Sequence, residues 1–312
     1  MTAQPAQLPE LDGHGGNKVF EDKPLENYAA LKDRCASFGW DLQAMTPSIG
    51  AEVLGIDLTK EMGADELKTL REVLLDWKVM FFRDQDITSE DHVRFSGYFG
   101  ELEVHPFAPC HPDHKELLVI THDENSKGKE NAWHSDVTWR EAPSLGSVLR
   151  ARELPEVGGD TLFSNMYAAY DGLSDEIKGK IEGRKARHDF WPFRMAMQAN
   201  GAPEEQIKAF EEKYPNPWHP IVRTHPETGR KGIYVNVAFT VEVEGMDNQE
   251  GAELLKHLWA QAATPEYQCR FRWAPNSIAF WDNRSCQHYA ASDYFPNRRA
   301  MERATIIGDV PR

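Results

Sequence analysis

The chain has 312 residues, of which 40% are hydrophobic and 11% aromatic, so it can bury a substantial core in one large domain or two small ones. Its 35 basic and 50 acidic side chains give a formal net charge of −15, which argues against nucleic acid and an anionic membrane surface as partners. The four cysteines form no CxxC pair, no signal peptide begins the sequence and no apolar run approaches the ~20 residues that cross a bilayer, so we expect reduced thiols and a cytoplasmic protein.

The first half of the chain is expected to be an irregular arm followed by short alternating elements. Residues 1–38 are rich in proline, glycine and charge without a clear period, which predicts a loosely ordered N-terminal arm. Ser89 and Gly100 are boundary signals for a helix between them, with Ser89 as the N-cap. Hydrophobic periodicity predicts the elements that follow the arm: a strand pair over 48–59, helices over 63–78 and 89–100, strands over 79–85 and 116–122, and a polar loop over 123–132.

The second half is predicted to be richer in strands. Residues 189–220 show no clean period and hold several prolines and aromatics, which suggests an insertion or lid. Residues 268–283 contain two alternating runs separated by Pro275-Asn276, which predicts a hairpin. The other expected elements are strands over 144–155, 158–163, 232–243 and 300–309 and helices over 166–183 and 248–263. This pattern favours a mainly β fold with flanking helices, a double-stranded β-helix (jelly roll) that forms a single domain over 39–312.

Two histidines and one carboxylate form a candidate metal site. If His134 and Asp136 lie in a strand, the spacing of two places both side chains on one face. With His288, they would form the two-histidine, one-carboxylate triad of non-haem Fe(II) oxygenases, which leaves coordination positions open for O₂ and a co-substrate. Taken alone, the pair also fits a surface pair on an edge strand, and His288 fits a hydrogen-bonded buried histidine.

The sequence around these residues resembles the taurine/TfdA-type family of 2-oxoglutarate-dependent dioxygenases. The matching stretches, which span roughly residues 40–310, include "WHSDVTW", "ELPEVGGDTLFSNMYAAYDGLS", "HPIVRTHPETGRKGIYVN" and "WDNRSCQHYAASDYFPNRRAMERATIIGD". The resemblance implies that His134, Asp136 and His288 bind Fe(II). It also implies O₂ and 2-oxoglutarate as co-substrates, with decarboxylation of 2-oxoglutarate to succinate and CO₂.

The same resemblance implies roles for further residues. Arg299, eleven residues after His288, would pair with the distal carboxylate of 2-oxoglutarate, and Thr161 would hydrogen-bond the same molecule. A guanidinium suits this task because it binds a carboxylate through two parallel hydrogen bonds. Without the resemblance, Arg299 reads as a solvated charge and Thr161 as an ordinary strand threonine.

The prime substrate is expected to be a small organic anion. Arg303 and His105 match residues that grip the anionic head group in sulfonate-cleaving members, and even spacing puts Arg303 on the strand face of Arg299. Phe190 and Phe239 match apolar wall positions, and Trp191, Phe193, Met195 and Met197 are further candidates for the wall or for core packing. Arg303 alone also fits a pair with a local acid, Glu302 or Asp309.

Two positions depart from the taurine pattern, and they bear on the substrate. Taurine enzymes have a tyrosine where this chain has Ala108 and an asparagine where it has Glu130. Ala108 would enlarge the pocket, and Glu130 could meet a cationic group of the substrate or point to water. We therefore expect hydroxylation of a sulfonate or sulfate ester, or of a carboxylate such as an aryloxyalkanoate or amino acid. A zinc hydrolase and a non-catalytic binding module remain as other classes. A homo-oligomer, dimer or tetramer, is possible.

Overall fold

The computed structural model describes residues 24–105, 108–128 and 130–312. Its helices are α1 (Pro24–Ser37), α2 (Ala64–Trp77), α3 (Ser89–Gly97), α4 (Met166–Asp171), α5 (Asp175–Ile181), α6 (Trp191–Ala199), α7 (Glu204–Lys213) and α8 (Asn248–Gln261). Its strands are β1 (Asp41–Ala44), β2 (Ala51–Leu54), β3 (Val79–Phe82), β4 (Leu117–His122), β5 (Gly146–Glu153), β6 (Thr161–Asn165), β7 (Lys185–His188), β8 (Trp218–Pro220), β9 (Val222–Thr224), β10 (Lys231–Ile233), β11 (Thr240–Val243), β12 (Gln268–Phe271), β13 (Ile278–Asp282), β14 (Cys286–Ala290) and β15 (Arg299–Ile306).

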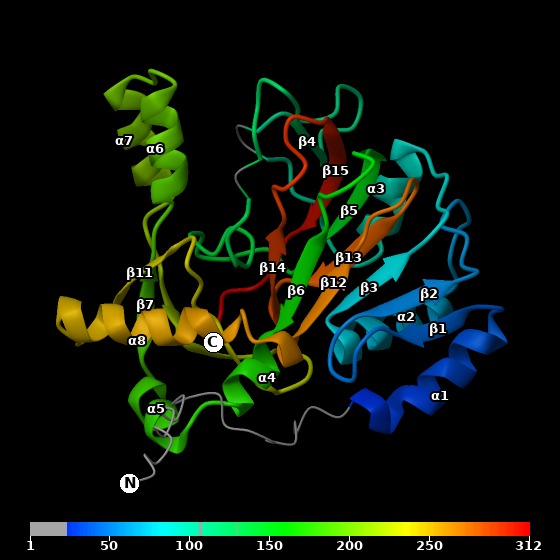
Figure 1. Cartoon of the computed structure of the whole chain (residues 1–312), viewed down its shortest axis with the longest axis horizontal. Helices are drawn as coiled ribbons and strands as arrows, with labels where there is room; N and C mark the ends of the chain where they lie inside the picture. The colour runs from blue at the N-terminus through cyan, green and yellow to red at the C-terminus, as the bar shows by residue number, and fades with distance from the viewer. Residues whose placement is uncertain (1–23, 106–107, 129) are drawn as a thin grey trace, which may run out of the picture.

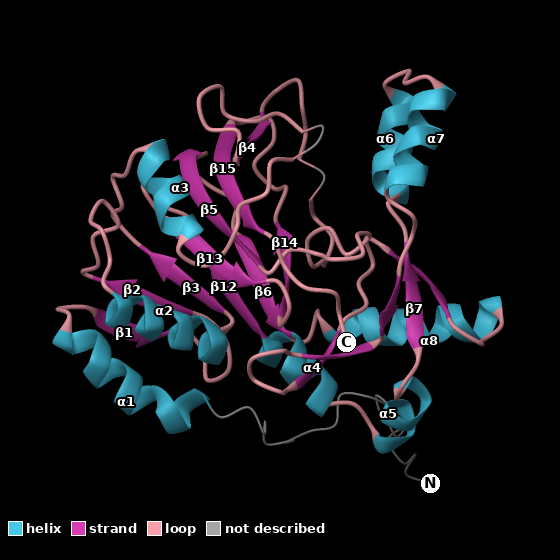
Figure 2. Cartoon of the chain, turned by 180° about the vertical axis from the view of Figure 1, so that it is seen from behind, coloured by secondary structure: helices cyan, strands magenta, loops and turns pink. Residues whose placement is uncertain are grey.

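A seven-stranded sheet forms the body of the protein, with strand order β1-β2-β3-β13-β5-β15-β4. Its pairings are antiparallel except that of β2 with β3, which is parallel. Helices α1, α2 and α3 cover one face of this sheet, as Figures 1 and 2 show from opposite sides. The strands β3 and β13 are buried along their whole length, and their sequences are apolar except for Asp282 at the end of β13.

A three-stranded sheet, β12-β6-β14, packs against the other face of the large sheet. Side chains alternate between the two faces of β3, so Met80 and Phe82 pack under the helices while Val79 and Phe81 point to the smaller sheet. There the Phe81 ring stacks on Phe271 of β12 with centroids 4.0 Å apart. Each such buried side chain contributes roughly 1.5–3 kcal/mol, so the core between the sheets holds the two layers together.

The remaining elements form a second unit beside these sheets. Strands β11, β7 and β8 form a three-stranded sheet, β9 pairs with β10, and α8 packs against β11 over a separate apolar cluster. Helices α6 and α7 stand between β7 and β8 in the sequence and form a helical hairpin that projects away from the sheets (Figures 1 and 2). Among the described residues, none of the helices combines the length and hydropathy that crossing a bilayer requires.

Several expected elements differ from the observed ones. Residues 24–37 form helix α1 rather than a loose arm, because Leu31 and Cys35 are buried in the core and Tyr28 packs edge-on against Trp77 of α2 at 5.5 Å. Residues 1–23 lie outside the described residues. The N-cap of α3 is Thr88 rather than Ser89, since the Thr88 hydroxyl accepts a hydrogen bond from the N–H of Asp91.

The predicted hairpin over 268–283 is wrong. Its two runs become β12 and β13, which lie in different sheets: β12 pairs with β6, and β13 pairs with β3 and β5. The expected strand pair over 48–59 contains β2 alone, and its antiparallel partner β1 precedes it. The helix expected over 166–183 is split into α4 and α5, because Ser174 begins a new helix by capping the N–H of Ile177.

Candidate metal centre and its two chambers

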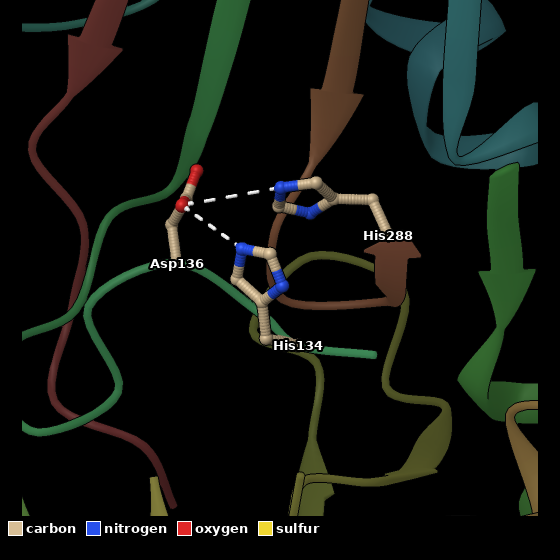
Figure 3. Close-up of side chains that lie close together, drawn as sticks. All are labelled: His134, Asp136 and His288. Atoms are coloured by element: carbon tan, nitrogen blue, oxygen red, sulfur yellow. Dashed lines mark ion pairs between the residues drawn. The ribbon is translucent and has the colours of Figure 1, made fainter. Parts of the chain in front are cut away.

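Three side chains from distant parts of the sequence converge between the two facing sheets. His134 pairs with His288 of β14 through an isolated two-bond bridge, His134 N–H to His288 O at 3.1 Å and His288 N–H to His134 O at 2.8 Å. The Nε2 atoms of His134 and His288 lie 3.8 and 4.0 Å from Oδ1 of Asp136. All three ligand atoms lie within 4.8 Å of one another and point to a common centre (Figure 3). A divalent metal fits such a set of donors.

Asp136 reaches this centre from a turn rather than from a strand. The expectation of an i, i+2 pair on one strand face is therefore wrong, because the chain leaves the bridge after His134 and Val137 adopts a positive φ of 48°. Asn283 fixes the turn: its Oδ1 accepts the N–H of Asp136 at 2.6 Å, and its Nδ2 donates to the carbonyl of Asp136 at 3.0 Å. Sequence spacing gave no signal for this role of Asn283.

The protonation states suit a metal site. His134 Nδ1 lies 2.7 Å from the carbonyl of Ala132, so Nδ1 carries the proton and Nε2 keeps its lone pair. Burial, with a further contribution from His134, lowers the pKa of His288 to about 3. Burial raises the pKa of Asp136, but Arg303, His288 and His134 outweigh it and lower that pKa to about 2. At neutral pH the site is thus a carboxylate with a neutral His288, and metals bind deprotonated ligands.

A small chamber on one side of the centre contains the residues expected to bind 2-oxoglutarate. Thr161 and Arg299 both line it, together with Trp281 and His288, and both are almost fully buried. Nε and Nη2 of Arg299 have no hydrogen-bond partner among the described residues. Burial lowers the pKa of Arg299, and the neighbouring Tyr294 and acidic groups offset this only in part. A buried cation with two unpartnered donors fits an ionised carboxylate.

A larger chamber of about 440 Å³ opens on the other side of the centre. Arg303, His105, Glu130 and Phe239 line it, as expected for a substrate site. Four residues line both chambers: Ile120, Glu130, His134 and Arg303. Because His134 is one of them, the candidate metal centre lies where the two chambers meet. Most of the other lining residues are apolar: Ala108, Pro109, Leu118, Val119, Ile120, Ala132, Val137, Pro192, Phe193 and Ala238.

Arg303 lies beside a candidate metal ligand. Its Nη1 donates to Oδ1 of Asp136 at 2.9 Å, so neither of the local acids, Glu302 and Asp309, is its partner. Glu302 lies beside Arg152 at 3.5 Å, and Asp309 pairs with Arg223 at 2.8 Å. Residues 299, 301 and 303 all line the small chamber, as the even spacing along β15 predicts.

The places of Glu130 and of the aromatic wall residues differ in part from those expected from the sequence. Glu130 lies 3.1 Å from Nε2 of His122 on β4, so the carboxylate is paired with an imidazole. Phe190 does not line the described chambers: it is fully buried behind Trp139, with the guanidinium of Arg194 4.7 Å above its ring. Phe193, one turn further along α6, forms the wall instead and lies 6.2 Å from Phe239. Trp191 and Met195 are 42% and 58% exposed and face solvent.

A two-histidine, one-carboxylate centre beside a chamber with a buried arginine that keeps two unpartnered donors among the described residues defines the class of 2-oxoglutarate-dependent non-haem iron dioxygenases. Residues 41–305 match the family described as "Taurine catabolism dioxygenase TauD, TfdA family". The chain belongs to this family.

Individual relatives agree with this assignment. The chain is 32% identical over 274 residues to an "Alkylsulfatase" of Acinetobacter baylyi, covering 86% of this chain and 85% of the relative. It is 30% identical over 287 residues to an "Alpha-ketoglutarate-dependent sulfate ester dioxygenase" of Pseudomonas putida, covering 91% and 94% of the two chains. The crystal structure of a taurine dioxygenase from Burkholderia xenovorans superposes with a TM-score of 0.75 at 35% identity, covering 87% of this chain and 90% of that one.

Proposed function

We propose that the protein is an Fe(II)- and 2-oxoglutarate-dependent dioxygenase that hydroxylates an alkyl sulfate ester or sulfonate. The observation that carries this proposal is the larger chamber, which has a cationic and hydrogen-bonding end at the metal centre and an apolar wall elsewhere. The relatives named for sulfate esters and alkyl sulfates support the same substrate class.

The described residues fit the iron and its co-substrate. His134, Asp136 and His288 would hold Fe(II), and Arg299 with Thr161 would hold the distal carboxylate of 2-oxoglutarate. Bound Fe(II) supplies O₂ activation and C–H hydroxylation, coupled to decarboxylation of 2-oxoglutarate to succinate and CO₂. The apolar side chains around the centre exclude water from the reacting atoms.

His105 and Arg303 are proposed to hold the anionic head group. His105 Nδ1 accepts the N–H of Ala108 at 3.0 Å, so a neutral ring carries its proton on Nε2 and donates from there. Burial, followed by the charges of Arg140 and Arg303, lowers the pKa of His105 to about 4 and keeps the ring neutral at pH 7. The neutral N–H donor of His105, beside the guanidinium of Arg303, can bind a sulfate oxygen without adding a second positive charge to the chamber.

The rest of the larger chamber is proposed to hold the organic part of the substrate. Ala108 leaves space at its wall, and Phe193 with Phe239 offers an apolar surface. Glu130 is paired with His122, so it does not stand as an isolated carboxylate for an ammonium group. An alkyl chain therefore suits the chamber better than the short aminoethyl group of taurine.

Product release from a panel of anions tests the proposal. Protein loaded with Fe(II) is mixed with 2-oxoglutarate, O₂ and one candidate: taurine, alkylsulfonates, alkyl sulfates of increasing length or phenoxyacetates. Hydroxylation of the carbon that bears the sulfur group gives an unstable product, so we expect sulfate or sulfite in equal amount to succinate. Succinate stimulated by phenoxyacetates alone would favour the carboxylate alternative, which relatives named for phenoxypropionate and 2,4-dichlorophenoxyacetate represent. Sulfate release without O₂ would indicate a hydrolase.

We further propose that the two facing sheets form a double-stranded β-helix, or jelly roll, in a single catalytic domain over 39–312. The hairpin α6–α7 within 189–220 is the proposed lid, since Pro192 and Phe193 of α6 line the larger chamber. A cytoplasmic location and a homo-oligomeric state are also parts of the proposal, and cell fractionation and light scattering test them.

A further inference from the structure

Trp273 contacts one of the two residues expected to bind 2-oxoglutarate. It follows β12 in the connection to β13, and the pairing of Phe271 with Thr161 brings it next to β6. Its indole Nε1 donates a hydrogen bond of 3.0 Å to Oγ1 of Thr161, and both side chains are buried. The sequence gave no signal for this contact, since the hairpin expected over 268–283 would have paired the two runs with each other.

This hydrogen bond fixes the role of the Thr161 hydroxyl. An indole N–H can only donate, so Oγ1 must accept, and the hydroxyl proton must point to a different acceptor. No acceptor for that proton stands among the described hydrogen bonds of Thr161, and Thr161 is one of the residues that line the smaller chamber. The geometry therefore directs the O–H into the chamber, where a carboxylate oxygen can accept it.

Trp273 also flanks the second expected residue. The centre of the Arg299 guanidinium lies 5.9 Å from the Trp273 ring and 5.8 Å from the ring of Tyr294. Gly159 contributes by leaving space, because a Cβ at this position would lie 3.1 Å from Cδ and Nε of Arg299. Rings on its flanks limit the directions in which the guanidinium can point.

We propose that Trp273 is a positioning residue for 2-oxoglutarate, which sets the Thr161 hydroxyl as a donor and holds Arg299 toward the same carboxylate. This inference rests on the proposed function. It concerns the distal carboxylate alone, so loss of the indole N–H weakens co-substrate binding while the metal centre and the catalytic step are unchanged.

A double-mutant cycle tests the proposal. The variants are Trp273→Phe, which keeps an aromatic ring without the N–H, Thr161→Val, and the two combined. The readout is the dissociation constant of 2-oxoglutarate from Mn(II)-loaded protein, measured by calorimetry without turnover. Trp218→Phe, a half-exposed tryptophan on β8, is the matched control. Thermal midpoints and Mn(II) stoichiometry are measured for every variant.

We expect Trp273→Phe to raise the dissociation constant about threefold to tenfold, the effect of one hydrogen bond. In the Thr161→Val background, Trp273→Phe should raise the dissociation constant less than about twofold, because the acceptor of the indole N–H is already gone. With Fe(II), the KM for 2-oxoglutarate should rise by the same factor while kcat is retained.

Equal effects of Trp273→Phe in both backgrounds, or a dissociation constant equal to that of the parent, would overturn the proposal. If Trp273→Phe unfolds, Trp273→Met fills the space without an N–H donor and takes its place in the cycle. Absence of 2-oxoglutarate binding by the parent protein would instead refute the proposed function.

Discussion

Substitution of Arg299 by lysine tests the co-substrate chamber most sharply. Arg299 is 5% exposed and lines the chamber, and its Nε and Nη2 have no hydrogen-bond partner among the described residues. A guanidinium presents these two donors in parallel to one carboxylate, whereas an ammonium group acts as a single point charge. Loss of one charge-assisted hydrogen bond costs about 1.5–3 kcal/mol, which is an increase of about 10- to 150-fold in the dissociation constant of 2-oxoglutarate.

Calorimetric titration of Mn(II)-loaded protein with 2-oxoglutarate measures this effect. The neighbouring Arg298 offers a matched control, since it is exposed and donates to Glu153 at 2.7 Å outside the chamber. Arg298→Lys should bind 2-oxoglutarate as the parent does. Parent-like binding by Arg299→Lys, or equal weakening by both substitutions, would refute the assignment of Arg299 to the distal carboxylate.

Three further predictions concern stability, metal and substrate. Burial lowers the pKa of His92 to about 4 from the usual 6.5, so the unfolded chain takes up the proton first as the pH falls. The free energy of unfolding should therefore decrease by about 1.4 kcal/mol per pH unit as the pH falls from 6.5 to about 4. The free energy of unfolding, measured with urea, should depend less steeply on pH in His92→Gln than in the parent. An unchanged dependence would show that protonation of His92 is not the cause. Asp136→Ala should abolish stoichiometric Fe(II) binding, which metal analysis after desalting checks; full metal occupancy would exclude Asp136 as a ligand. Phe193→Ala should raise the KM for dodecyl sulfate about tenfold with little effect on ethyl sulfate. Met195→Ala, which alters the exposed side of the same helix, should change neither, and equal effects on both substrates would place the alkyl chain elsewhere.

Elements with a strong local period were predictable from the sequence. The helix expected over 63–78 is α2 at Ala64–Trp77, and Leu70, Val73 and Leu74 are all buried as their spacing indicates. The strands expected over 116–122 and 300–309 are β4 and β15. In these segments the local hydrophobic pattern and the tertiary environment favour the same secondary structure, so the pattern alone is sufficient to predict the element.

Pairing between strands was not predictable in the same way. The runs around Pro275 alternate as a hairpin would, but β13 is recruited into the large sheet by β3 and β5, and β12 pairs with β6. Nothing in a local period distinguishes a hairpin turn from a crossover between facing sheets.

The candidate site was found through residue types and family resemblance rather than through local geometry. The structure brings His134, Asp136 and His288 together, yet Asp136 arrives from a turn with Val137 at positive φ. The roles of Asn283 and Trp273 depend on contacts over 147 and 112 positions of sequence, which only the folded chain creates. The family resemblance assigned Phe190 to the apolar wall of the substrate site, but the fold buries Phe190 and brings Phe193 to the larger chamber.

Coupling between 2-oxoglutarate decarboxylation and O₂ tests the central claim most directly. Fe(II)-loaded protein is given 2-oxoglutarate and an alkyl sulfate, and O₂ consumed, succinate and sulfate are measured in the same sample, with Asp136→Ala as the comparison. Equal amounts of all three from the parent protein, and none above background from Asp136→Ala, are the predicted result. Sulfate formed without O₂ uptake, or succinate formed equally by Asp136→Ala, would contradict the account.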